Sequence, residues 1–294
     1  MNFIREGLII KITGGYYYVK SGAETWVCTL RGRFRQEKEK ILVGDRVQLK
    51  PVQTATGTGV IEKILPRKNT LFQPSIANIS QIVVVISLQE PKPNLYLLDC
   101  FLTQTELAKV KTVLCFNKVD LGRQQLDSFI QIYGSLGYVI LTTSAKTKHG
   151  LADLRGVLKN NTSLLAGPSG VGKSSLLNTL IPGLSLNTRE ISPKLKQGKH
   201  TTRYVELILT PDNGLVADSP GFSSLPLPDI NREELAPCFV EIYKHQENCK
   251  YSNCLHITEP DCAVQKAVLE GKINPSRYQN YLLLLKEMNK RKRY

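Results

Sequence analysis

Residues 162–180 read TSLLAGPSGVGKSSLLNTL. Residues 163–166 form a short apolar run typical of a buried strand, and residues 174–180 follow a helical pattern. Between them lies a glycine-rich segment that fits G-x-x-x-x-G-K-[ST]. Its glycines let backbone N–H groups close around an anion, and the helix that follows adds the positive end of its dipole. The stretch therefore predicts a phosphate-binding loop between a strand and a helix.

The chemistry of a bound triphosphate gives individual residues of this loop a role. Lys173 is expected to reach the β- and γ-phosphates, and the Ser174 hydroxyl is expected to ligate Mg²⁺. The alternative is a glycine-rich turn without a ligand, and the strand–loop–helix context favours phosphate binding. The predicted nucleotide-binding residues here are Gly167, Pro168, Ser169, Gly170, Val171, Gly172, Lys173, Ser174 and Ser175.

Two shorter motifs lie upstream, each directly after a predicted strand. The first resembles the N-K-x-D element of GTPases and consists of Asn117, Lys118, Val119 and Asp120. The second resembles the S-A-K loop that contacts the guanine O6 and consists of Ser144, Ala145 and Lys146. The Asp120 carboxylate is expected to accept from guanine N1–H and the 2-amino group. Adenine lacks this donor pair and would leave a buried carboxylate unpaired, so the motifs predict a guanine nucleotide.

Two further elements follow the phosphate loop. Residues 218–221 come after a predicted strand and resemble the D-x-x-G element. Asp218 is expected to hold Mg²⁺ through a water, and the Gly221 N–H to sense the γ-phosphate. Residues 198–203 lie in a polar loop at the position of switch I, where Thr201 or Thr202, with Thr202 preferred, is expected to ligate Mg²⁺.

The predicted catalytic residues are His200, Lys173 and Thr202. Phe222 stands after D-x-x-G, where Ras-like enzymes carry the glutamine that orients water. A phenyl ring cannot orient water, so slow intrinsic hydrolysis of GTP is expected. His200 is the local candidate for positioning the water, and a solvated loop histidine is an equal alternative.

The order of the motifs is unusual. GTPases normally begin with the phosphate loop, whereas here N-K-x-D and S-A-K precede it. Alternating strands and helices predict a parallel sheet with helices on both faces. A site built from loops at the carboxyl ends of such strands survives recutting of the chain, because each loop keeps its own strand. The sequence therefore predicts a circularly permuted GTPase, and a monomer, since no second subunit is needed to complete the site.

The first 68 residues contain a different pattern. Five short strands are predicted, at residues 7–13, 16–20, 24–31, 46–51 and 60–65. In this stretch 13 Lys and Arg oppose 6 Asp and Glu, a net charge of +7. A basic five-stranded barrel with aromatic side chains is how OB-folds bind nucleic acid. The alternative is that the tyrosines pack the barrel and the arginines form a solvated edge.

The net charge of +14 for the whole chain points to a polyanionic partner, with nucleic acid ahead of an anionic membrane surface. No run is long enough to span a bilayer and no signal peptide is evident, so a cytoplasmic protein is expected. The predicted RNA-binding residues are Arg31, Arg33, Arg35, Lys290, Arg291, Lys292 and Arg293.

A metal site is predicted near the C-terminus. Its four candidate ligands lie within fourteen residues and are Cys249, Cys254, His256 and Cys262. Three thiolates and one imidazole make a closed tetrahedral set, which is typical of one structural Zn²⁺ in a small helical module. The alternative is unligated core cysteines. The other four cysteines, Cys28, Cys100, Cys115 and Cys238, are expected in the core.

Together these features resemble the RsgA family of small-ribosomal-subunit biogenesis GTPases, also known as YjeQ or YloQ. The resemblance implies a multidomain fold: an all-β OB-fold barrel in residues 1–68, a circularly permuted α/β P-loop GTPase domain in 69–228, and a helical zinc-binding domain with a basic tail in 229–294. It also implies binding to the 30S subunit and its rRNA late in maturation, with ribosome-stimulated GTP hydrolysis.

Two alternative functions share every nucleotide motif. One is a GTPase that acts on another RNA, such as tRNA or the large subunit. The other is an RNA-binding nucleotide switch with negligible turnover, an idea that Phe222 supports.

Overall fold

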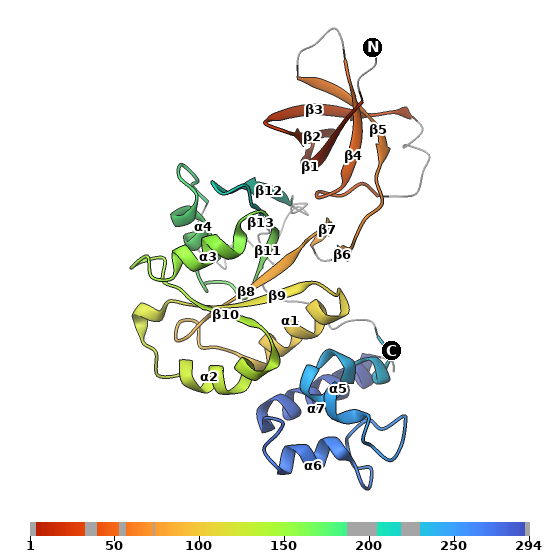
Figure 1. The fold of residues 1–294 in the computed structure, drawn as a ribbon, viewed down its shortest axis with the longest axis vertical. Helices are drawn as coiled ribbons and strands as arrows, with labels where there is room; N and C mark the ends of the chain where they lie inside the picture. The colour runs from red at the N-terminus through yellow and green to blue at the C-terminus, as the bar shows by residue number, and fades with distance from the viewer. Residues whose placement is uncertain are drawn as a thin grey trace, which may run out of the picture.

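The computed structural model describes residues 4–32, 40–52, 57–72, 74–186, 205–218 and 230–291. Three parts follow one another in Figure 1, with a β-barrel at the top, an α/β part in the middle and a helical part at the bottom. This succession confirms the predicted fold class.

The barrel consists of β1 (Arg5–Thr13), β2 (Tyr16–Ser21), β3 (Glu24–Leu30), β4 (Arg46–Pro51) and β5 (Thr58–Ile64). The barrel closes because β1 pairs with both β2 and β4, while β5 pairs with β3 and β4. Apolar side chains that alternate along these strands fill the interior. The buried ones are Ile9, Val19, Trp26, Cys28, Val47, Leu49 and Ile61.

A short hairpin joins the barrel to the α/β part, and the sequence patterns did not predict it. It consists of β6 (Thr70–Phe72) and β7 (Ser75–Ala77). Val43 of the barrel forms a β-bridge with Ile76 of the hairpin. The buried carboxylate of Asp45 accepts two hydrogen bonds from Arg67, at 2.6 and 2.8 Å. These contacts fasten the end of the barrel to the chain that leaves it.

The central sheet has the strand order β10-β9-β8-β11-β13-β12. Its strands are β8 (Gln81–Ser87), β9 (Lys111–Asn117), β10 (Val139–Thr142), β11 (Thr162–Ala166), β12 (Glu206–Leu209) and β13 (Leu215–Asp218). The first five in this order are parallel, as predicted, whereas β12 is antiparallel to β13. The chain returns from β12 to β13 through a tight turn with no helix, and such a connection can only join antiparallel strands.

Helices cover both faces of this sheet (Figure 1). On one face lie α1 (Leu95–Leu107) and α2 (Leu126–Tyr133), and on the other lie α3 (Leu151–Leu158) and α4 (Lys173–Leu180). Single 3₁₀ turns, η2 (Val119–Leu121) and η3 (Gly134–Leu136), follow β9 and α2. All residues of β8 are buried, as expected for a strand covered on both faces.

Barrel and central sheet are continuous through one strand pair. β12 pairs with β1 at Lys11 and Glu206, whose side chains form an ion pair of 2.9 Å. This pairing joins all strands of both parts into one eleven-stranded sheet. The sequence patterns predict the barrel and the central sheet as separate domains and do not predict this pairing.

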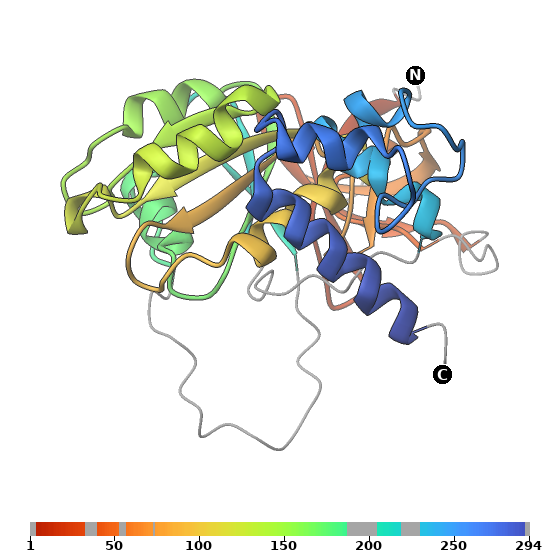
Figure 2. The ribbon, with the colours of Figure 1, turned by 90° about the horizontal axis from the view of Figure 1, so that it is seen from below.

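The C-terminal part contains η4 (Arg232–Glu234), η5 (Ala236–Cys238), α5 (Val240–Gln246), α6 (Ala263–Leu269) and α7 (Pro275–Arg291). Its core, which includes Phe239 and Tyr281, also takes in Cys100 and Tyr96 from α1. Figure 2 shows α7 crossing α1, and the two helices are in contact. Within the described residues, no helix is both long and apolar enough to cross a bilayer.

Candidate nucleotide site and metal centre

The glycine-rich loop leaves the carboxyl end of β11, which lies between β8 and β13 in the sheet, and enters α4. Gly167 has φ +135°, and a Cβ there would lie 2.1 Å from the Val85 carbonyl oxygen. Gly172 has φ +97°, and its Cβ would lie 2.4 Å from Asn117 Nδ2. Only glycine permits this backbone and this close approach to neighbouring strands.

Lys173 begins α4, and its ammonium group lies within the loop. Lys173 Nζ donates hydrogen bonds to the carbonyl oxygens of Gly167, at 2.7 Å, and Pro168, at 2.9 Å. Ser174 and Ser175 follow in the first turn of α4 and are half-buried. The Lys173 ammonium group is thus held at the phosphate loop, at the position from which it is expected to reach a phosphate.

The Asn117 side chain joins the phosphate loop to the two upstream motifs. Its Nδ2 donates to the Val171 carbonyl oxygen at 2.8 Å, and its Oδ1 accepts from Thr143 Oγ1 at 3.0 Å. All three residues are buried, with Asn117 only 1% exposed. The sequence reasoning missed Thr143, whose only signal was a hydroxyl at the end of a strand directly before S-A-K.

The N-K-x-D and S-A-K motifs contact each other directly. Ser144 Oγ donates to Asp120 Oδ1 at 2.5 Å, and the Val119 N–H donates to the Thr143 carbonyl at 3.2 Å. Ala145 packs into the core on the α3 side, and Lys146 is exposed. Lys118 has φ +63°, and its Nζ donates to the Glu90 carbonyl oxygen at 2.6 Å. The structure therefore brings three of the predicted motifs to one edge of the sheet.

The downstream motifs are described only in part. Asp218 ends β13, the strand beside β11, so its backbone lies at the same edge of the sheet. Gly221 and Phe222 lie outside the described residues, as do His200, Thr201 and Thr202.

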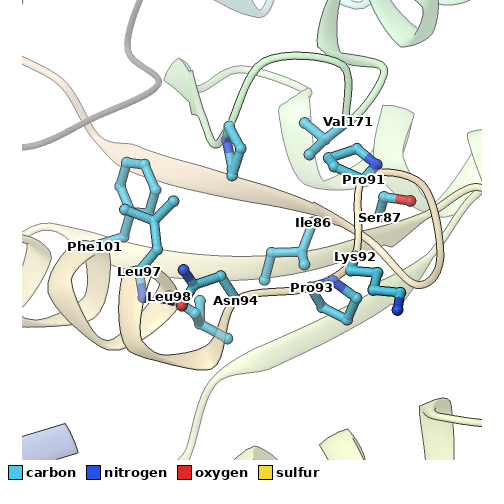
Figure 3. Close-up of a pocket in the computed structure, with 11 residues that line it drawn as sticks. Ile86, Ser87, Pro91, Lys92, Pro93, Asn94, Leu97, Leu98, Phe101 and Val171 are labelled. Atoms are coloured by element: carbon cyan, nitrogen blue, oxygen red, sulfur yellow. Dashed lines mark hydrogen bonds between the residues drawn. The ribbon is translucent and has the colours of Figure 1, made fainter.

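A small apolar cavity of about 100 Å³ lies between the phosphate loop and the segment that joins β8 to α1. Figure 3 shows Val171 on one side of it, with Leu97, Leu98 and Phe101 of α1 on the other. The lining of this cavity is mostly apolar, so it suits hydrocarbon rather than a phosphate. We therefore place no part of the nucleotide in it.

The structure describes three of the seven predicted RNA-contacting residues. Arg31 is exposed, and its guanidinium pairs with the Glu62 carboxylate at 2.5 Å. Lys290 and Arg291 belong to the last turn of α7. Arg33, Arg35, Lys292 and Arg293 lie outside the described residues.

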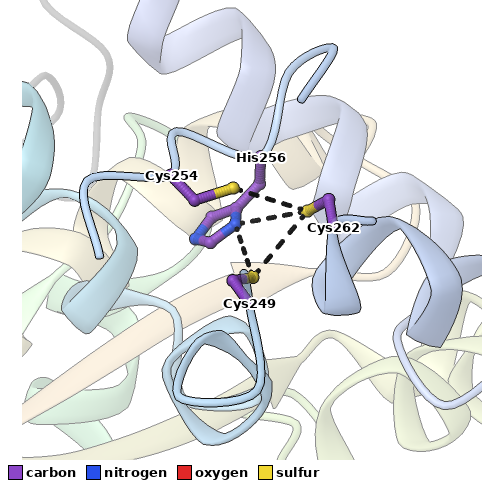
Figure 4. Close-up of side chains that lie close together, drawn as sticks. All are labelled: Cys249, Cys254, His256 and Cys262. Carbon is purple, nitrogen blue, oxygen red and sulfur yellow. Dashed lines mark hydrogen bonds between the residues drawn. The ribbon is translucent and has the colours of Figure 1, made fainter. Parts of the chain in front are cut away.

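The four predicted metal ligands converge in the C-terminal part (Figure 4). Cys249 follows α5, Cys254 and His256 lie in the next loop, and Cys262 caps α6. Their ligand atoms all lie within 4.8 Å of one another, so the cluster could hold a metal ion. The other four cysteines are buried, as predicted.

The protonation chemistry of this cluster suits a cation. Burial lowers the pKa of His256, so the imidazole is neutral, as a metal ligand must be. Burial, with the neighbouring Cys262 and Cys249 thiols, raises the pKa of Cys254 to about 12. The crowded sulfurs thus disfavour thiolates unless a positive charge lies among them.

A buried ionic network, which the sequence did not reveal, fastens the helical part to α1. The side chain of Arg277 on α7 is 1% exposed. It donates to Asp99 of α1 at 2.5 Å and to Glu241 of α5 at 2.6 and 3.1 Å. Asp99 also accepts from Tyr133 and Asn280. The helical part and its cysteine–histidine cluster are therefore held against the α/β part through α1.

Comparisons with known proteins agree with this arrangement. The models of the RsgA GTPase and of the RsgA N-terminal domain match residues 64–228 and 6–61. The small ribosomal subunit biogenesis GTPase RsgA of Moorella thermoacetica is 46% identical over 98% of this chain and 99% of its own. The protein of the same name from Carboxydothermus hydrogenoformans is 42% identical over 96% of this chain and 97% of its own.

Two solved structures have the same fold. The crystal structure of YjeQ from Thermotoga maritima has a TM-score of 0.86 at 38% identity, over 97% of this chain and 99% of that one. The structure of YloQ, described as a circularly permuted GTPase, has a TM-score of 0.82 at 36% identity, over 98% of this chain and 96% of that one. With phosphate loop, guanine motifs and family models in agreement, the chain belongs to the RsgA family of GTPases.

Proposed function

We propose that this GTPase acts in late biogenesis of the small ribosomal subunit, binding the 30S particle and its rRNA and hydrolysing GTP when bound there. The supporting observation is 46% sequence identity, over 98% of this chain, to a protein named for that process. The net charge of +14 suits an RNA partner.

The guanine base is proposed to lie against Asp120. Ser144 holds one oxygen of this carboxylate, which orients the group toward the base. Asn117 fixes the distance between the base motifs and the phosphate loop. Lys118, Val119, Ala145 and Lys146 complete the base side of the site.

The triphosphate is proposed to lie in the loop from Gly167 to Ser175. Lys173 would exchange its two bonds to carbonyl oxygens for bonds to the β- and γ-phosphates. The oxygens proposed for Mg²⁺ come from Ser174, Asp218 and Thr202, and oxygen ligands suit this hard cation. When bound, the ion neutralises charge that develops on the transferred phosphoryl group. Gly221 would meet the γ-phosphate, and His200 would position water.

The metal of the C-terminal cluster is proposed to be one structural Zn²⁺. A tetrahedral site with Zn–S of 2.3 Å and Zn–N near 2.05 Å requires S···S of about 3.8 Å and S···N of about 3.6 Å. The observed S···S distances are 3.7 Å for Cys254–Cys262 and 3.9 Å for Cys249–Cys262. The His256 Nδ1 lies 3.6 Å from Cys249 and 3.5 Å from Cys262. All four ligands come from the chain, so no position stays open for catalysis.

Three sequence-based expectations complete the proposal. The protein works in the cytoplasm, acts as a monomer, and contacts rRNA through the barrel and the basic tail. An RNA contact of Arg31 would have to compete with its ion pair to Glu62.

Co-sedimentation with a non-hydrolysable GTP analogue tests the partner. The protein should pellet with purified 30S particles and remain in the supernatant with 50S particles or tRNA. Lys173→Ala serves as the control, since it should weaken analogue-dependent pelleting. Equal binding to 30S and 50S would contradict the small-subunit proposal.

Turnover measurements test the activity. The rate of GTP hydrolysis should be low for the protein alone and higher with 30S particles. This stimulation should weaken steeply as the salt concentration rises, because each neutralised phosphate contributes about −0.7 to −0.9 to the slope of log binding constant against log salt concentration. His200→Ala should abolish the stimulation while sparing 30S binding. Absence of turnover under every condition would favour the nucleotide-switch alternative.

A further inference from the structure

His256 adopts a backbone conformation that its side chain does not favour. Its φ is +60°, in the left-handed region that non-glycine residues rarely occupy. This conformation turns the ring so that Nδ1 faces the sulfurs of Cys249 and Cys262 (Figure 4). Something in the fold must hold the main chain there, because a relaxed backbone would move the ring away from the cluster.

The ring itself is not held from its other side. Metal-binding histidines usually donate their second ring N–H to a carboxylate, a carbonyl or water. Here Nε2 is buried and has no hydrogen-bond partner among the residues that the structure describes. The orientation of His256 must therefore come from its main chain.

One carboxylate holds the main chain on both sides of His256. Glu259 Oε1 accepts from the Leu255 N–H at 2.8 Å, and Oε2 accepts from Ile257 at 2.7 Å and Thr258 at 3.1 Å. Partial burial raises the pKa of Glu259, but its own backbone N–H and the three N–H groups above outweigh the burial and lower the pKa overall, so the group is an anion. Glu259 does not belong to the group of ligand atoms that lie within 4.8 Å of one another, so it is not a fifth ligand.

The carbonyl groups of the same loop are held from α7. Tyr278 O–H donates to the His256 carbonyl at 2.6 Å, and Tyr281 O–H donates to the Leu255 carbonyl at 3.0 Å. These bonds hold the carbonyl groups of the loop on α7, and the Glu259 bonds hold the N–H groups on both sides of His256.

We propose that Glu259 is a positioning residue for the metal centre. Glu259 holds His256 in its left-handed conformation, so that Nδ1 already faces the metal position before the ion binds. This inference rests on the proposed metal site. A ligand held in advance loses less conformational freedom on binding, so the contribution of Glu259 should appear in metal affinity.

The experiment uses the full chain, stripped of metal, with Co²⁺ as spectroscopic probe and Zn²⁺ measured by competition with a chromophoric chelator. The variants are Glu259→Ala, which removes the acceptor, and Glu259→Gln, which retains one oxygen. Glu270→Gln is the matched control. It removes the same charge from an exposed carboxylate of the same part, paired with Lys272.

Glu259→Ala should raise the metal dissociation constant by about 10- to 100-fold, Glu259→Gln by a smaller factor, and Glu270→Gln not at all. If Glu259→Ala does not fold, the Gln variant decides the question. In a His256→Ala background, Glu259→Ala should have no further effect, because the carboxylate acts through that ligand.

Three outcomes have distinct meanings. Unchanged affinity in both Glu259 variants overturns the inference while leaving the metal site intact. If Glu259→Ala weakens metal affinity by the same factor in the His256→Ala background, the inference is also overturned, because Glu259 would then stabilise the loop as a whole. Failure of the unmodified chain to bind either metal overturns the metal site itself.

Discussion

The Asn117 amide contacts the phosphate loop with its nitrogen and Thr143, the residue before S-A-K, with its oxygen. An amide can do both because it carries a donor and an acceptor at opposite ends. Thr143 and Ser144 lie next to each other and serve different motifs, one orienting Asn117 and the other Asp120. Single side chains thus set the spacing between the base and phosphate sides of the site.

Asp120→Asn should change the preferred nucleotide from GTP toward xanthosine triphosphate. The amide offers a donor where the carboxylate accepted, and xanthine presents an oxygen where guanine carries the 2-amino group. Competition binding with the two triphosphates measures the ratio. Asp127→Asn, an exposed aspartate at the start of α2, is the control. A wild-type preference in Asp120→Asn would show that Asp120 does not read the base.

Thr143→Val should weaken nucleotide binding without unfolding the domain. The change keeps the shape of the side chain but removes the hydrogen bond to Asn117, worth about 1 kcal/mol or roughly fivefold in the GDP dissociation constant. Fluorescent GDP titration measures it. Thr142→Val is the control, because the Thr142 hydroxyl is hydrogen-bonded to the exposed His149 and not to Asn117. Equal affinities in the two variants would remove Thr143 from the site.

At the level of elements, α1 belongs to two cores at once. Its inner face, with Leu98 and Phe101, packs on the central sheet, while Cys100 packs in the helical core that carries the cysteine–histidine cluster. Its buried Asp99 meets Arg277 of α7. A helix with an apolar stripe on one side alone could not link two such bodies.

Arg277→Met should destabilise the protein by about 3–5 kcal/mol, because it leaves the buried Asp99 and Glu241 carboxylates unpaired. Denaturant unfolding measures the change. Arg155→Met is the control, since its ion pair with Asp212 is solvent-exposed and worth at most about 1 kcal/mol. Similar losses in the two variants would mean that the network contributes no more than a surface pair.

At the level of the whole molecule, neighbouring parts are joined by different means. The barrel is joined to the GTP-binding part by strand pairing between β1 and β12, and the helical part by side-chain packing and buried charge on α1. The nucleotide edge of the sheet and the metal cluster are thus connected through folded structure rather than through a bare linker.

Removal of the metal should unfold the helical part first, because the metal-binding free energy contributes to its folding. The sheet should remain folded, while α1, which carries Asp99 and Cys100, should lose protection against amide hydrogen exchange. Hydrogen exchange with and without a strong chelator measures this. Uptake should rise across residues 230–291 and in α1 but not in β9 or β11. Unchanged exchange throughout would show that no metal stabilises this part.

The sequence alone determined the phosphate loop, the guanine motifs and the cysteine–histidine set, because each depends on residue types at short, regular spacing. It also determined the alternation of strands and helices, which follows from local periodicity. The tertiary structure alone decided the antiparallel β12 and its pairing with β1, the Thr143–Asn117 bond, and the burial of Arg277 against Asp99. These contacts join residues far apart in the chain, and their geometry depends on how whole elements pack, which no local pattern records.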